Sequence, residues 1–110
     1  MLGFSCPSLD GDVELPAQRE EQILRHHPEL SLDLYWLLTE TLASPDLVDR
    51  RADREDVGFV RYFPELSGGR FFVAVVRSDR ERGNARLRHW LVTCYASRGV
   101  ETWKSLWERP

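Results

Sequence analysis

Two adjacent histidines carry the sharpest chemical signal in this sequence: His26 and His27 are followed directly by Pro28 and Glu29. Histidine has an unperturbed pKa of about 6.5 and can therefore exchange protons at neutral pH. Because proline disfavours helical backbone at the residue before it, the ring of His27 is expected to be held at the end of a helix. His27 is thus a candidate general acid or base, whereas His26 is expected to face solvent and contribute little. The alternative is that His27 only stabilises the helix end through the macrodipole.

A second group of candidates lies in residues 87–95, whose composition is typical of a strand. Side chains alternate between the two faces of a strand, so the segment divides into two sets. The set predicted to face the helices is Trp90, Val92 and Cys94. The opposite set, which could border a shallow groove, is His89, Leu91, Thr93 and Tyr95. Tyr62 of the neighbouring predicted strand could join either face, and all of these residues also fit ordinary half-exposed strand positions.

The charge of the chain limits how it could bind nucleic acid. Its 110 residues carry a formal net charge of −3, which excludes a basic footprint over the whole surface and leaves only local patches. Lys104 is the only lysine among 15 basic residues, and the arginines concentrate at positions 50–51 and in a predicted hairpin at residues 77–88. The residues predicted to contact an RNA backbone are Arg50, Arg82, Arg86 and Arg88. A solvated loop, with Asp79 and Glu81 diluting the positive charge, is the alternative.

Several catalytic signatures are absent from the sequence. It contains no glycine-rich phosphate loop, nucleophile elbow, metalloprotease signature or paired-carboxylate arrangement. Cys6 and Cys94 are too few for a disulfide framework, and no Cys and His residues have the spacing of zinc ligands. A nucleotide-driven enzyme and a zinc hydrolase are therefore disfavoured. We expect reduced thiols and predict no cofactor and no metal.

The elements that must position these residues are expected to form one domain over residues 16–110, preceded by a flexible N-terminal arm at residues 1–15. A helix is predicted over residues 17–27. A second helix, capped by Ser31 or Asp33 and ended by residues 44–46, is predicted because its apolar positions between residues 34 and 42 recur at helical spacing. Strands are predicted over residues 47–52, 57–63, 70–77 and 87–95, and residues 102–107 form a short helix or an extended cover.

The predicted fold class is α+β. Two N-terminal helices are expected to pack on one face of an antiparallel sheet of about four strands, with a short C-terminal cover. The residues expected in its core are Leu34, Leu37, Leu38, Phe72, Val73, Val75, Trp90 and Val92. No apolar run approaches the roughly 20 residues of a membrane helix, and the first residues lack the pattern of a signal peptide. We therefore expect a cytoplasmic protein with no membrane partner.

The order of several short motifs resembles a known family. The motifs are residues 23–30 (ILRHHPEL), 44–48 (SPDLV), 57–62, 71–76, 91–95 (LVTCY) and the closing Leu106-Trp107. Together they look like the barnase–EndoU–colicin–RelE class of nuclease-like domains, specifically its phage-associated branch of small bacterial and phage proteins. The resemblance covers residues 16–107.

The resemblance implies a metal-independent ribonuclease, in which the RNA 2′-hydroxyl attacks its own phosphate with help from a general acid, a general base and a cation. His27 matches the family's His-Pro pair, Arg51 or Arg50 would supply the cation, and Thr93 and Tyr95 match positions of the last strand, with Tyr62 assisting. Relatives often have histidine where this chain has Gln22, and a Lys-Gly stretch where it has Thr102-Trp103.

Three functional hypotheses follow. The first is a toxin-type endoribonuclease, with a cognate antitoxin or immunity protein as a candidate partner. The second is a catalytically inactive relative that binds RNA or protein. The third is a small partner protein with no role in nucleic-acid chemistry, which the net negative charge favours.

Overall fold

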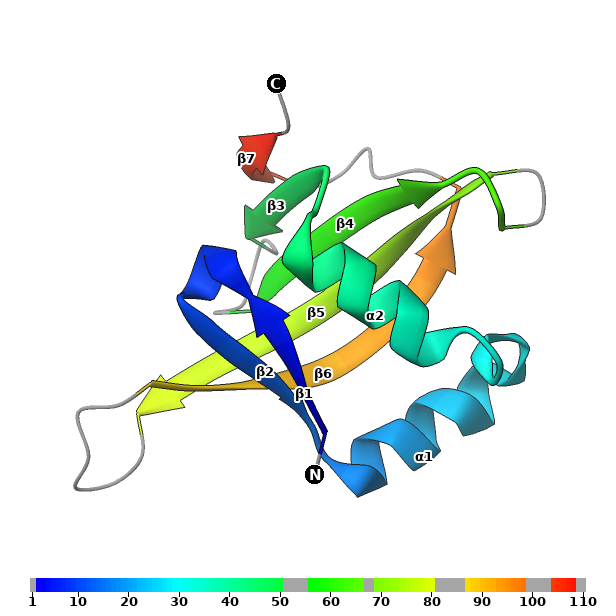
Figure 1. The fold of residues 1–110 in the computed structure, drawn as a ribbon, viewed down its shortest axis with the longest axis horizontal. Coiled ribbons are helices and arrows are strands. Elements are labelled where there is room, and N and C mark those ends of the chain that lie inside the picture. The colour runs from blue at the N-terminus through cyan, green and yellow to red at the C-terminus, as the bar shows by residue number, and fades with distance from the viewer. Residues whose placement is uncertain (1, 51–55, 67–68, 81–86, 99–103, 109–110) are drawn as a thin grey trace.

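Seven strands and two α-helices make up the part of the chain that the computed structural model describes, residues 2–50, 56–66, 69–80, 87–98 and 104–108 (Figure 1). Two short 3-10 helices, η1 and η2, complete these ranges. The elements in chain order are β1 (Leu2–Cys6), η1 (Pro7–Leu9), β2 (Gly11–Leu15), α1 (Ala17–His26), η2 (Pro28–Leu30), α2 (Leu34–Ala43), β3 (Leu47–Arg50), β4 (Val57–Phe63), β5 (Arg70–Arg80), β6 (Leu87–Ser97) and β7 (Lys104–Glu108).

All seven strands belong to one mixed sheet, with the order β1-β2-β6-β5-β4-β3-β7. Neighbouring strands are antiparallel except β2 and β6, which run parallel and pair Val13 with His89 and Glu14 with Trp90. The expectation of an antiparallel sheet of about four strands behind two N-terminal helices is therefore wrong. Two strands precede the helices, one strand pair is parallel, and the C-terminal segment is strand β7, paired with β3, rather than a short cover.

The N-terminal residues form a β-hairpin instead of the flexible arm expected for residues 1–15. Strands β1 and β2 pair from Leu2 with Leu15 to Cys6 with Gly11. Between them, η1 closes the turn with Asp10 in the left-handed region (φ 55°), where Asp is tolerated better than most residues. The inward side chains of the hairpin, Phe4, Cys6, Val13 and Leu15, are buried. With only two buried apolar residues in each strand, amid Ser, Pro, Gly and Asp, the alternation is too short to detect in the sequence.

The helices begin and end close to their predicted limits. α1 ends at His26, and His27 then leaves helical geometry (φ −133°, ψ 65°) ahead of Pro28. α2 buries one stripe consisting of Leu34, Leu37, Leu38, Thr41 and Leu42. It lies across the sheet, in front of β4 and β5 in Figure 1, so this stripe meets the inner face of the sheet.

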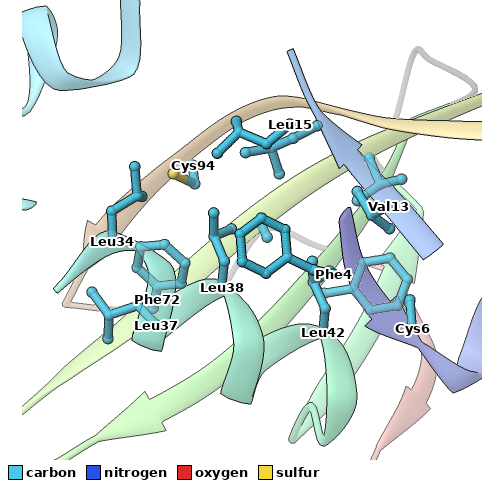
Figure 2. Close-up of a cluster of buried hydrophobic side chains, with 14 of the residues drawn as sticks. Phe4, Cys6, Val13, Leu15, Leu34, Leu37, Leu38, Leu42, Phe72 and Cys94 are labelled. Carbon is cyan, nitrogen blue, oxygen red and sulfur yellow. The ribbon is translucent and has the colours of Figure 1, made fainter. Parts of the chain in front are cut away.

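Most of the apolar core lies between α2 and the sheet. Figure 2 shows Leu38 near the centre of this cluster, with Phe4 and Cys6 on one side and Phe72 and Cys94 on the other. A smaller cluster of Val60, Val73 and Val75 is buried on the opposite face of the sheet. Of the eight residues expected in the core, six are buried. Trp90 and Val92 are only partly buried, so their assignment to the core is wrong.

A β-bulge in β6 explains this error. Val75 pairs with Thr93 but the next residue, Val76, pairs with Leu91, so Val92 is an extra residue in the strand. The bulge shifts the alternation of side chains by one position. Leu91 therefore joins Cys94 in the core beneath the helices, and His89, which pairs with Ser78, is buried as well. The predicted division of this strand into two faces holds for residues 93–95 and is reversed for residues 89–91.

Candidate functional site

A pocket of about 400 Å³ lies between α1 and the edge of β6. It exists because β2 pairs with β6 only as far as Trp90, after which α1 packs beside the strand in place of another strand. In Figure 1, α1 runs below the lower edge of β6. The pocket is lined from the helix side by Arg19, Gln22, Ile23, His26 and His27, and from the strand side by Val92 and Thr93.

The residues of α1 that line the pocket lie on one face of the helix. Arg19, Gln22, Ile23 and His26 are separated by three, one and three positions, which places them on one face of a helix. Ile23 is 4% exposed and anchors this face against the core. The bulged Val92 and the outward-facing Thr93 complete the wall opposite.

The two histidines have different hydrogen-bond environments. Nδ1 of His26 lies 2.9 Å from the carbonyl oxygen of Gln22. A carbonyl oxygen only accepts hydrogen bonds, so Nδ1 donates, and the lone pair of the neutral ring is then on Nε2. His27 instead places Nδ1 3.4 Å from Oε1 of Glu29, a contact that becomes an ion pair when the imidazole is protonated. The His27 side chain is 34% exposed, so solvent and solutes reach it.

The pocket lining carries the positive charge of Arg19, and the carboxylate of Glu29 contacts one lining residue, His27. The lining contains a guanidinium, two imidazoles, an amide and a hydroxyl, and no carboxylate. Within the described ranges, Arg19 makes no ion pair, whereas other arginines are neutralised by nearby acids. Those pairs are Arg25 with Glu21, Arg61 with Glu40, Arg77 with Asp56 and Arg88 with Glu14. In a chain with a net charge of −3, this pocket is suited to an anion.

The structure brings together two of the residues predicted to be catalytic, His27 and Thr93, which line the same pocket. Tyr95 lies two positions further along the same face of β6, but it packs against the Val60, Val73 and Val75 cluster and does not line the pocket. Tyr62 lies two strands away on β4, 44% exposed, with its ring centroid 5.2 Å from that of Phe71.

The arginines predicted to bind RNA are only partly described. Arg51, Arg82 and Arg86 lie outside the described residues, as does Thr102, and of Arg50 the structure gives only its backbone position at the end of β3. Arg88 donates from Nε to Glu14 of β2, and its guanidinium lies 5.8 Å from the ring centroid of Trp90. Its charge is therefore compensated within the protein.

Sequence reasoning missed two residues of the pocket, Arg19 and His26. The signal that identifies them is the helical spacing that places both on the same face as Ile23. Gln22 also lines this pocket. Among the described residues, no group of three or more His, Cys, Asp and Glu side chains is arranged to hold a metal ion.

Comparison of the chain with models of protein families, with curated proteins and with solved structures finds no match. No helix within the described ranges is both long enough and apolar enough to span a membrane. The fold is a small α+β domain, and its candidate site is a pocket that could hold an anion and exchange a proton with it.

Proposed function

We propose that the protein is a metal-independent endoribonuclease-like domain whose site is the α1–β6 pocket. The observation that carries this proposal is that His27 and Thr93, which lie far apart in the sequence, line one pocket that contains Arg19 and no carboxylate. An imidazole beside a site for an anion is the minimum needed to cleave a phosphodiester through the neighbouring ribose 2′-hydroxyl. The resemblance of the motif order to the barnase–EndoU–colicin–RelE class supports the same activity.

The proposed reaction needs no external nucleophile. A base removes the proton of the 2′-hydroxyl, the 2′-oxygen forms a bond to phosphorus, and the bond from phosphorus to the 5′-oxygen breaks. The departing 5′-oxygen takes a proton from an acid, leaving a 2′,3′-cyclic phosphate and a free 5′-hydroxyl. His27 transfers one of these protons, and the Thr93 hydroxyl donates a hydrogen bond to a non-bridging phosphate oxygen. By the family resemblance, Arg51 or Arg50 would add positive charge, and Tyr95 and Tyr62 would contact the RNA.

Cleavage of a mixed-sequence RNA in the presence of EDTA tests this proposal. The unmodified protein should produce fragments with 2′,3′-cyclic phosphate ends, identified by mass spectrometry. His27→Ala should lower the rate about 10²–10⁴-fold, the usual contribution of a general acid or base. Arg25→Ala is the matched control, because Arg25 also lies on α1 but pairs with Glu21 and does not line the pocket. A cleavage rate in His27→Ala equal to that of the unmodified protein would show that His27 transfers no proton and would contradict the proposal.

A second candidate function is that of a catalytically inactive relative that binds RNA. The specific observation in its favour is Gln22, which places an amide in the pocket at the position where relatives often carry histidine. An amide can donate and accept hydrogen bonds but cannot shuttle protons at neutral pH. Salt-dependent RNA binding without detectable cleavage, lost on substitution of the pocket residues, would favour this function over the first.

A further inference from the structure

We infer that the α1–β6 pocket is a phosphate-binding site in which Arg19 supplies the positive charge and His26 is a second proton-transfer group beside His27. This inference rests on the proposed function in its catalytic part, while phosphate binding by Arg19 can be tested without it. Neither residue is implied by the family resemblance, which points to Arg50 or Arg51 for the charge.

Arg19 has the properties of an anion-binding residue. Guanidinium groups are always protonated and match the geometry of phosphate oxygens. Arg19 is half-buried, lines the pocket and, among the described residues, makes no ion pair. Six residues further along α1, Arg25 donates instead to Glu21 at 2.9 Å and stays outside the pocket. The same helix therefore carries one arginine whose charge is satisfied and one whose charge is available to a ligand.

A second pocket of similar volume, about 410 Å³, shows that this character is not shared across the surface. Its lining includes one arginine, Arg70, together with three carboxylates from Glu29, Asp33 and Glu65. The negative charges of these carboxylates would repel a phosphate. Of these two pockets, only the one that contains Arg19 favours an anion.

The hydrogen bond of His26 leaves one of its ring nitrogens free to accept a proton. Its Nδ1 is occupied by the hydrogen bond to the Gln22 carbonyl oxygen, which leaves Nε2 as the basic nitrogen of the neutral ring. The Nδ1 of His27 instead lies 3.4 Å from Oε1 of the Glu29 carboxylate. The two rings are thus suited to complementary roles. His26 Nε2 takes the proton from the 2′-hydroxyl, and protonated His27 gives a proton to the departing 5′-oxygen.

Among the described residues, few charged groups line the pocket or contact this pair. α1 contributes Arg19, η2 contributes Glu29, and β6 contributes only the uncharged Val92 and Thr93. Cleavage should therefore depend on both histidines. His26→Ala and His27→Ala should each lower the cleavage rate about 10²–10⁴-fold, the usual contribution of a general acid or base.

Phosphate binding is tested by titrating the ¹⁵N- and ¹³C-labelled protein with inorganic phosphate and following the imidazole signals of His26 and His27 by NMR. Both signals should shift in the unmodified protein and in Arg25→Ala, and the phosphate affinity should fall at least tenfold in Arg19→Ala. The two variants remove the same charge from the same helix, so a general loss of positive charge would affect them equally. Equal affinities in the two variants, or imidazole signals that do not respond to phosphate, would overturn the site.

Cleavage assays separate this inference from the proposed function. If Arg19 is needed for phosphate binding but no variant or unmodified protein cleaves RNA, the ribonuclease proposal and the role of His26 are overturned and the phosphate site stands. If the protein cleaves RNA and His26→Ala keeps the cleavage rate, the role of His26 alone is overturned. Rescue of His26→Ala by added imidazole would support proton transfer, because imidazole does not restore a purely structural contact.

Discussion

Thr41 is the residue at which a single substitution should stabilise the fold. Its side chain is fully buried in the α2 stripe, and Oγ1 makes no hydrogen bond with any described residue. Burying a hydroxyl without a partner costs about 1–3 kcal/mol in proteins. Valine has nearly the same shape and a similar helix propensity. We therefore expect Thr41→Val to raise the free energy of unfolding by about 1–3 kcal/mol, measured by urea denaturation at constant m-value.

Thr39 provides the matched control on the same helix. Its side chain is exposed, and Oγ1 donates a hydrogen bond of 2.7 Å to the carbonyl oxygen of Tyr35. Thr39→Val should therefore change stability by no more than about 0.5 kcal/mol, as is usual for surface positions. At about 4 °C for each kcal/mol in a domain of this size, thermal unfolding should show the same contrast. A loss of stability in Thr41→Val would show that the hydroxyl is hydrogen-bonded in the folded protein and would refute the reasoning.

Two further predictions concern the core. Leu38 is fully buried in the centre of the α2 interface, so Leu38→Ala should lower the free energy of unfolding by about 2–5 kcal/mol, and an unchanged urea midpoint would contradict its place in the core. Burial raises the pKa of the Cys6 thiol to about 11 and that of Cys94 to about 12. The unfolded chain therefore loses these protons first, and the free energy of unfolding should fall as the pH rises above about 9, by up to about 1.4 kcal/mol per pH unit for each thiol. The free energy of unfolding of Cys94→Ala, measured by urea titration, should fall less steeply with pH than that of the unmodified protein. An equally steep fall would exclude the Cys94 thiol as its cause.

The candidate site could be predicted only in part. The dipeptide His27-Pro28 identifies a ring held at a helix end, because proline constrains the backbone of the residue before it wherever that residue lies in the fold. The hydroxyl of Thr93 was also among the predicted residues. Arg19 and His26 were not predicted, because the sequence does not show which element packs against their face of α1. That element is β6, whose edge β2 leaves uncovered beyond Trp90.

The sequence by itself determined the elements whose signal is local. The apolar stripe from Leu34 to Leu42 specifies α2, and the apolar run of β5 specifies a buried strand, because both signals are periodic patterns within one segment. Pro28 ends α1 because it constrains the backbone of the residue before it. Only the tertiary structure decided which strands pair. The N-terminal hairpin is stable because it adds to the sheet beside β6, and the bulge at Val92 reverses the faces of β6 because one extra residue shifts a period of two. Both depend on contacts between residues distant in the chain, and the pocket between α1 and β6 follows from them.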